Sequence, residues 1–217
     1  MVSQSSGAIG TTLRLAVLLS GSGRTLENLL GCIARKELPA RVEVVVSSRD
    51  GVRGIEIARA AGLPVTVIPR RAFPSVDAFS DAVWAAIAPY EVDLVILAGF
   101  LAKLAIPTAF EGRVMNIHPS LLPLFGGRGF YGDRVHRAVL EAGVKVSGCT
   151  VHFVDEEYDA GPIILQRCVP VLDDDTPESL AHRVFAEECR AYPEAIRLYA
   201  EGRLRIEGRR VRVLPRE

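Results

Sequence analysis

Short apolar runs alternate with helix-like segments through the first half of the chain, and this alternation restricts the possible folds more than any other feature. The strand-like runs cover residues 13–20, 41–47, 65–68, 93–98 and 114–117. The helix-like segments cover residues 26–35, residues 54–61 and a stretch that Ser75 or Asp77 is suited to cap and that ends at Ile87. Strands that alternate with helices of this length form βαβ units. We therefore expect an α/β fold with an open, mainly parallel twisted sheet and helices on both faces.

The second half of the chain has a different rhythm. A loop at residues 124–133 and a short helix at 135–142 precede two strands at 147–154 and 161–171. Thr176-Pro177-Glu178 then opens a long helix that ends at Gly202, because proline is well tolerated in a first helical turn. The β-prone residues 204–214 predict a C-terminal β-hairpin. With no repeat and no linker, we expect a flexible tail at residues 1–12 and a single domain at residues 13–217.

Composition excludes some classes of partner. Lys plus Arg and Asp plus Glu number 26 each among 217 residues, so net charge gives no reason to expect a nucleic-acid or membrane partner. No apolar run approaches the roughly 20 residues that span a bilayer, and the Ser- and Gly-rich tail does not resemble a signal peptide. The four cysteines, at positions 32, 149, 168 and 189, form no CxxC pair. They indicate reduced thiols in a cytoplasmic protein and no metal site.

Asn116 and His118 stand where an apolar strand enters a stiff turn, Pro119-Ser120-Leu121-Leu122-Pro123. Each proline pushes the residue before it into an extended conformation, and positions two apart on a strand share one face. An amide donor beside a group that titrates near neutral pH can stabilise an oxyanion and move a proton. A lone histidine at a strand end is more often a packing or surface residue. Here, however, a polar pair would be a costly way to build an ordinary loop.

The loop Gly21-Ser22-Gly23-Arg24-Thr25 joins the first strand to the first helix and is a second candidate site. Such a turn can present backbone N–H groups to an anion at the positive end of a helix dipole. Leu26 occupies the position of the third glycine of a dinucleotide fingerprint, and no acidic residue ends the second strand. A phosphate site or a plain tight turn both fit this loop, whereas a dinucleotide site does not.

A third candidate is the acidic loop Asp155-Glu156-Glu157-Tyr158-Asp159-Ala160-Gly161-Pro162. A cluster of acids in a loop is usually solvated surface. A carboxylate followed by Ala-Gly-Pro nevertheless has a constrained backbone, and beside His118 it would fix the tautomer of that ring. The sequence places both groups in loops at strand ends, where open parallel sheets bind their ligands.

Four motifs occur together in the order and at the spacing of one enzyme family. They are Leu18-Leu19-Ser20-Gly21-Ser22-Gly23, Leu97-Ala98-Gly99-Phe100, the run from Asn116 to Pro123, and Val151-His152-Phe153-Val154 with Asp159-Ala160-Gly161-Pro162. In combination they resemble phosphoribosylglycinamide formyltransferases, the folate-dependent enzymes of purine synthesis. The similarity extends from about Leu13 to the end of the chain and implies the Rossmann-like fold of formyltransferases.

The resemblance implies transfer of the formyl group of 10-formyltetrahydrofolate, a co-substrate, to the amine of glycinamide ribonucleotide without a metal. It implies that Asn116 hydrogen-bonds the formyl oxygen, that His118 moves the proton, and that Asp159 holds and polarises His118. The implied positions for the ribonucleotide are Gly21, Gly23, Arg24, Thr25, Pro119 and Glu188. The implied positions for the folate are Leu101, Ala102, Lys103, Leu104, Thr150, His152, Val154 and Asp155. The implied partners are these two small molecules, for a monomer or homodimer in the cytoplasm.

The sequence also departs from the pattern of the family. Phe100-Leu101-Ala102-Lys103-Leu104 lacks the arginine that relatives often carry there, which leaves Lys103 as a substitute for contacts to the folate tail. Val76 stands where relatives tend to have a basic residue, although Arg70 and Arg71 are close in sequence. Arg24-Thr25 replaces the common Ser-Asn, which should keep or increase affinity for a phosphate.

Two alternatives share the central motif, and a third comes from a different class of protein. A formyltetrahydrofolate deformylase passes the formyl group to water, and relatives of that kind carry an N-terminal regulatory domain. A methionyl-tRNA formyltransferase needs an additional tRNA-binding domain and a basic surface. A binding module without catalysis would fit the fold equally well, but it would not explain why Asn116, His118 and Asp159 all match.

Overall fold

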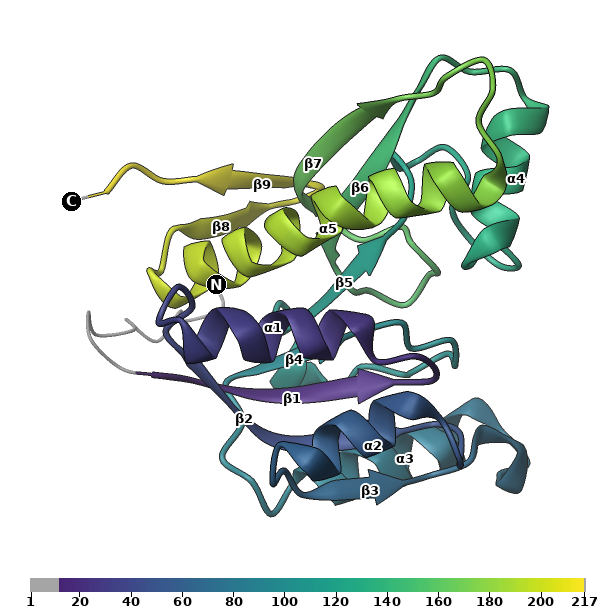
Figure 1. Cartoon of the computed structure of the whole chain (residues 1–217). Coiled ribbons are helices and arrows are strands. Elements are labelled where there is room, and N and C mark those ends of the chain that lie inside the picture. The colour runs from purple at the N-terminus through teal and green to yellow at the C-terminus, as the bar shows by residue number, and fades with distance from the viewer. Residues whose placement is uncertain (1–11, 217) are drawn as a thin grey trace.

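The computed structural model describes residues 12–216, which form one nine-stranded sheet with helices on both faces (Figure 1). The strand order is β3-β2-β1-β4-β5-β6-β7-β9-β8. The predicted tail at residues 1–12 lies outside the described residues except for Thr12. No helix within residues 12–216 is long and apolar enough to cross a membrane.

The first five strands pair in parallel, as the alternating pattern predicts. These strands are β1 (Leu13–Leu19), β2 (Ala40–Ser47), β3 (Val65–Val67), β4 (Leu94–Leu97) and β5 (Val114–His118). The helices between them are α1 (Arg24–Ala34), α2 (Arg53–Ala60) and α3 (Val76–Ile87). Ser75 caps α3, because its hydroxyl accepts a hydrogen bond from the Ala78 N–H at 3.1 Å. Both faces of the sheet are covered, so β4 is wholly buried and reads as a continuous apolar run.

The second half contains α4 (Asp133–Glu141), β6 (Val146–Phe153), β7 (Ile163–Pro170), α5 (Pro177–Ala200), β8 (Leu204–Glu207) and β9 (Arg210–Val213). β6 runs antiparallel to both β5 and β7, and β8 and β9 form the predicted C-terminal hairpin. Two short 3₁₀ helices, η1 (Arg70–Ala72) and η2 (Thr108–Phe110), were not expected. The sheet is therefore parallel in its first half and mixed in its second.

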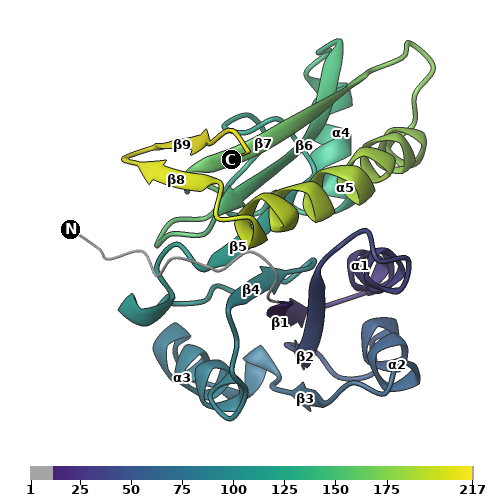
Figure 2. The same ribbon diagram turned by 90° about the vertical axis from the view of Figure 1, so that its left-hand side faces the viewer.

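Two apolar clusters hold the helices on the sheet. Residues of α1, α4 and α5 pack into one cluster, and residues of α3 pack into the other on the opposite face (Figure 2). At the boundary between the two halves, the buried Tyr192 of α5 donates its hydroxyl to the carbonyl oxygens of Leu97 at 3.1 Å and Met115 at 2.8 Å. This contact ties the carboxyl end of β4 and the beginning of β5 to α5, and the candidate site lies at the carboxyl ends of these two strands.

Candidate active site

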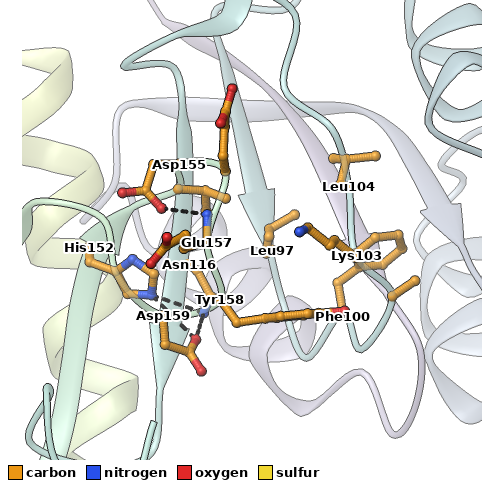
Figure 3. Close-up of a pocket in the computed structure, with 13 residues that line it drawn as sticks. Leu97, Phe100, Lys103, Leu104, Asn116, His152, Asp155, Glu157, Tyr158 and Asp159 are labelled. Atoms are coloured by element: carbon orange, nitrogen blue, oxygen red, sulfur yellow. Dashed lines mark hydrogen bonds and ion pairs between the residues drawn. The ribbon is translucent and has the colours of Figure 1, made fainter. Parts of the chain in front are cut away.

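A cavity of about 70 Å³ opens at the carboxyl ends of β4 and β5 (Figure 3). Ligands of open α/β sheets bind at this edge, outside the ends of the strands. The lining residues are Leu97, Phe100, Ala102, Lys103, Leu104, Asn116, His152, Val154, Asp155, Glu156, Glu157, Tyr158 and Asp159. Apolar side chains from β4 and the segment after it face an acidic loop across the cavity.

Asp159 contacts both polar residues of the central motif. Its Oδ1 accepts a hydrogen bond from Asn116 Nδ2 at 3.3 Å, and its Oδ2 lies 3.4 Å from His118 Nδ1. Asn116 and His118 are two residues apart on β5, so the pleat of the strand turns both toward the same loop. The structure thus brings together three residues of which the first and the last, Asn116 and Asp159, are 43 positions apart in the sequence.

Burial and two hydrogen bonds determine the state of Asp159. Burial by itself raises the pKa of this carboxyl, but hydrogen bonding to His118 and to the N–H of Gly127, 2.9 Å from Oδ2, outweighs burial and lowers the pKa below its ordinary value. Its backbone has φ of 53°, a left-handed conformation that a non-glycine residue rarely adopts. Asp159 is therefore an ionised, rigidly held acceptor at neutral pH.

His118 is buried, and its two ring nitrogens have different partners. Nε2 lies 2.8 Å from the carbonyl oxygen of Phe125. A carbonyl oxygen only accepts hydrogen bonds, so Nε2 carries a proton. Nδ1 faces the Asp159 carboxylate, which can accept a hydrogen bond from Nδ1 when this nitrogen also carries a proton. The ring is thus oriented to hold or release a proton at Nδ1 beside a fixed negative charge.

His152 controls the orientation of the Asn116 amide. Its Nδ1 donates to the carbonyl oxygen of Phe153 at 2.8 Å, which leaves Nε2 of the neutral ring as an acceptor. That acceptor lies 3.1 Å from Asn116 Nδ2. Turning the amide over would place its oxygen against this lone pair and against Asp159. The NH₂ group of Asn116 is therefore held within the cluster, bonded to His152 and Asp159 (Figure 3).

The glycine-rich loop packs tightly onto the start of α2. Gly23 has φ of 72°, and a Cβ added to it would lie 2.5 Å from the Cα of Gly54. Gly21 accepts a hydrogen bond from the N–H of Gly54 at 3.0 Å. Helix α1 begins at Arg24, two residues earlier than predicted, and has no side-chain cap. Arg24 and Thr25 thus occupy a first turn whose N–H groups remain available to an anion.

Glu188 of α5 lies in the same region as Arg24 and His118. Burial raises the pKa of Glu188 to about 7, and the positive charge of Arg24 and that of protonated His118 oppose this rise. The Arg24 guanidinium stacks on the ring of Phe185, 4.2 Å from its centroid. Arg24, His118 and Glu188 therefore lie close enough to act on one another electrostatically.

Replacing Glu188 with glutamine is expected to change how stability depends on pH. An unfolded glutamate loses its proton near pH 4.5, whereas folded Glu188 keeps its proton up to a pKa of about 7. The folded state binds more protons between these values, so the free energy of unfolding of the wild type falls as pH rises through that window. Glutamine does not titrate, so the stability of Glu188→Gln relative to wild type should increase from pH 5 to pH 8. Because Glu188 is partly exposed, solvent screening limits this increase to about 1–2 kcal/mol.

Urea unfolding of both proteins at the two pH values measures this change. Glu178→Gln, at an exposed position in the first turn of the same helix, is the control and should show a much smaller change. A stability difference that is the same at pH 5 and pH 8 would contradict the assignment.

His136 is a polar residue of this region that the sequence did not suggest. It is 4% exposed on α4, and its Nδ1 has no hydrogen-bond partner within the described part of the chain. Burial lowers its pKa, Asp133 opposes that effect, and the charges of His118 and Arg24 reinforce it. A single histidine on an otherwise apolar helix face carries no chemical signal in the sequence, which is why it was missed.

The residues that the resemblance assigns to the folate separate into two groups. Those that line the cavity are Ala102, Lys103, Leu104, His152, Val154 and Asp155. Leu101 and Thr150 lie outside the lining. The Thr150 hydroxyl instead donates to the Ser120 carbonyl at 2.7 Å and accepts from the Leu122 N–H at 3.0 Å, so it holds the turn that contains the half-buried Pro119.

Tyr158 is a wall of the cavity that the sequence analysis did not single out. Lys103 Nζ lies 5.7 Å from the centroid of its ring. Acidic loops with one aromatic residue are common on protein surfaces, so no sequence pattern distinguishes this residue. Its contact with Lys103 connects the two sides of the cavity mouth.

Comparison with known proteins defines the class of this chain. A family model described as formyl transferase matches residues 13–196, and the chain therefore belongs to the formyl transferase family. The crystal structure of glycinamide ribonucleotide transformylase 1 from Symbiobacterium toebii superposes with a TM-score of 0.90 at 50% identity, over 97% of this chain and 100% of that chain. The family predicted from the motifs is thus confirmed.

Curated relatives carry related names. The chain is 40% identical to the chloroplastic phosphoribosylglycinamide formyltransferase of Arabidopsis thaliana, over 88% of this chain and 67% of that protein. It is 44% identical to the trifunctional purine biosynthetic protein adenosine-3 of Gallus gallus, over 89% of this chain. The chain spans only 19% of the length of that trifunctional relative.

Proposed function

We propose that this chain is a phosphoribosylglycinamide formyltransferase. It transfers the formyl group of 10-formyltetrahydrofolate to the amine of glycinamide ribonucleotide, a step of purine synthesis. The observation that carries the proposal is the cluster in which Asp159 contacts both Asn116 and His118 at the edge of the cavity. The likeness to a transformylase over 97% of this chain and 100% of that chain supports the same activity.

The proposed chemistry uses the three clustered side chains. Attack of an amine on a formyl carbon produces a tetrahedral intermediate with an oxyanion and a protonated amine, so the site needs a hydrogen-bond donor and a proton relay. Asn116 supplies the donor. Its hydrogen bond to Asp159, at 3.3 Å, is longer than its bond to His152, and the N–H that makes this longer bond is shared with the oxyanion. His118 takes up and returns the proton at Nδ1, and Asp159 orients and stabilises the charged ring.

The proposed site for the ribonucleotide is the region of α1 and α5. The phosphate binds at the start of α1, where Gly21 and Gly23 allow close approach of the backbone and Arg24 and Thr25 add side-chain donors. Glu188 contacts the ribose hydroxyls. Pro119 holds the turn after His118 rigid, so that this turn contacts the same substrate.

The formyl donor binds in the cavity between β4 and the acidic loop. Its fused ring system is flat and apolar with polar edges, and the lining has that character: Leu97, Phe100 and Leu104 are apolar and Asp155 is charged. Bound there, the donor supplies an activated formyl group. The residues of the chain hold this group beside Asn116 and keep water away from it. Ala102, Lys103, His152 and Val154 complete the walls, Leu101 and Thr150 support them, and no metal takes part.

The proposal includes a single domain from residue 13 onward, acting as a monomer or homodimer in the cytoplasm without nucleic-acid or membrane partners. None of the four cysteines forms a disulfide, which supports a reducing compartment. Among residues 12–216, no three His, Cys, Asp or Glu side chains gather into a group able to hold a metal ion.

The test is an assay with 10-formyltetrahydrofolate in the presence and absence of glycinamide ribonucleotide, following tetrahydrofolate and free formate. We expect tetrahydrofolate to form only with the ribonucleotide and no formate to be released. Formate release without the ribonucleotide would identify a deformylase and remove the phosphate role of Gly23, Arg24 and Thr25. Absence of turnover, with both ligands still bound by wild type and His118→Ala alike, would identify a binding module.

A further inference from the structure

The proposed chemistry makes no use of the C-terminal hairpin. Strands β8 and β9 lie beyond residue 196, where the match to the family model ends. The hairpin joins the sheet through the parallel pairing of Arg210 in β9 with Ile163, the first residue of β7 (Figure 2). The acidic loop at residues 155–162 ends directly before Ile163. The two-residue turn of the hairpin, Gly208-Arg209, therefore lies beside the loop that carries Asp159.

Arg209 has a different kind of partner from the arginines around it. Six arginines follow Ala200, and four of them are paired with Glu201 or Glu207, namely Arg203, Arg205, Arg212 and Arg216. Arg209 instead donates from Nη2 to the carbonyl oxygen of Ala160 at 2.9 Å. A charged donor makes a stronger hydrogen bond than a neutral one. The guanidinium of the turn thus reaches out of the hairpin to the residue directly after Asp159.

The hairpin is a firm support for this contact. Its two ends are joined, because the Leu214 N–H donates to the Arg203 carbonyl at 2.8 Å and Arg203 Nε donates to the Leu214 carbonyl at 2.7 Å. Leu204 and Val211 are partly buried and pack against the apolar cluster that holds α5. Arg209 therefore projects from a packed part of the fold and can restrain the loop that it touches.

The restrained peptide lies in a constrained stretch of backbone. Asp159 has φ of 53°, an unfavourable conformation for a residue with a side chain. Gly161 is pressed against the Phe153 carbonyl oxygen, which a Cβ at position 161 would approach to 1.8 Å. Ala160 links these two residues, so fixing its carbonyl limits rotation of the backbone between them.

The contacts of the Asp159 carboxylate are long, and small movements of the loop therefore matter. Oδ1 lies 3.3 Å from Asn116 Nδ2, and Oδ2 lies 3.4 Å from His118 Nδ1. Both distances are close to about 3.5 Å, beyond which a hydrogen bond is lost. A small shift of the carboxylate away from β5 breaks both contacts.

We infer that Arg209 is a positioning residue for Asp159. By holding the Ala160 carbonyl, it keeps this carboxylate in contact with Asn116 and His118. The inference rests on the proposed function, which assigns these three side chains to formyl transfer. The phosphate site at the start of α1 does not involve the hairpin, so loss of the guanidinium should impair turnover and leave binding of the ribonucleotide intact. A hydrogen bond that only attaches the hairpin to the surface would change neither.

The test is steady-state kinetics of Arg209→Ala with both substrates varied. We expect kcat to fall about 3- to 10-fold, the scale of one hydrogen bond, while KM for the ribonucleotide stays within about 2-fold. Arg209→Lys should recover most of the lost kcat, because the contact uses a single N–H of a charged group. Arg212→Ala removes another exposed arginine of the same hairpin, one that pairs with Glu207, and is the matched control that should keep the kcat of wild type.

Hydrogen exchange of residues 155–162, followed by mass spectrometry, tests the contact without turnover. Exchange should be faster in Arg209→Ala than in wild type or Arg212→Ala, because local opening of the loop has lost a restraint. Unchanged exchange in Arg209→Ala would overturn the inference, and so would an unchanged kcat or an equal loss of kcat in Arg212→Ala. Turnover of wild type with unchanged kcat and exchange in Arg209→Ala would reject only this inference. Faster exchange in Arg209→Ala, with no ribonucleotide-dependent turnover in wild type, would reject only the proposed activity.

Discussion

Asn116→Ala is expected to lower kcat for formyl transfer about 100- to 1000-fold, because removal of one oxyanion donor costs this much in comparable acyl-transfer sites. The amide is positioned by two bonds, to His152 at 3.1 Å and to Asp159 at 3.3 Å, and alanine makes neither. A donor used mainly in the transition state should affect kcat more than the KM for either substrate. Steady-state kinetics with both substrates varied would measure the two effects.

The chain offers a matched control, since its other asparagine is Asn28 on α1. Asn28 Nδ2 donates to the Cys189 carbonyl at 3.0 Å, a structural contact between α1 and α5. Asn28→Ala loses the same amide and should reduce stability by about 1 kcal/mol while changing kcat only a few-fold. A loss of less than about 5-fold in Asn116→Ala would reject the oxyanion role, given the size of the effect elsewhere.

The second large effect is on folding. Gly161→Ala is expected to reduce the free energy of unfolding by about 3 kcal/mol or more, because a Cβ at position 161 would lie 1.8 Å from the carbonyl oxygen of Phe153. Phe153 is also the residue whose N–H donates to the Pro162 carbonyl at 2.9 Å, so the backbone has no free direction in which to move. Urea unfolding followed by circular dichroism measures the loss.

The same substitution acts on the chemistry through His152. The Phe153 carbonyl that the new Cβ would displace is the acceptor that fixes the His152 tautomer at 2.8 Å. Any Gly161→Ala protein that folds should therefore also lose formyl transfer. Gly21→Ala is the control for stability, because a Cβ there would meet no atom within 4 Å, and it should change the free energy of unfolding by less than about 1 kcal/mol. A Gly161→Ala protein as stable as wild type would show that the close contact can relax.

The parallel half of the fold was predictable because strands buried on both faces read as continuous apolar runs. β1, β2 and β4 lie within one or two residues of the predicted bounds. The direction of β6 was not predictable, since a strand has the same side-chain period whichever way it runs. Its antiparallel pairing with β5 places His152 opposite Asn116, and this pairing creates the contact that orients the amide.

The catalytic candidates were recognised from motifs, and their contacts were not. The pattern around Asn116 and His118 could show a shared strand face, and the Ala-Gly-Pro after Asp159 could show a constrained carboxylate. That Asp159 touches both residues depends on the close approach of Gly161 to Phe153, which only packing determines. Arg209 is one of six arginines after Ala200, and only the pairing of β9 with β7 brings it to the Ala160 carbonyl.

The sequence by itself determined the alternation of strands and helices, the rigid turn after His118 and the family, because these depend on local preferences and on short motifs. The tertiary structure alone decided which side chains come together: Asp159 contacts Asn116 and His118, and Arg24 lies close enough to Glu188 to lower its pKa. Contacts between residues more than forty positions apart are selected by the combined packing of all elements. No short sequence pattern therefore predicts these contacts.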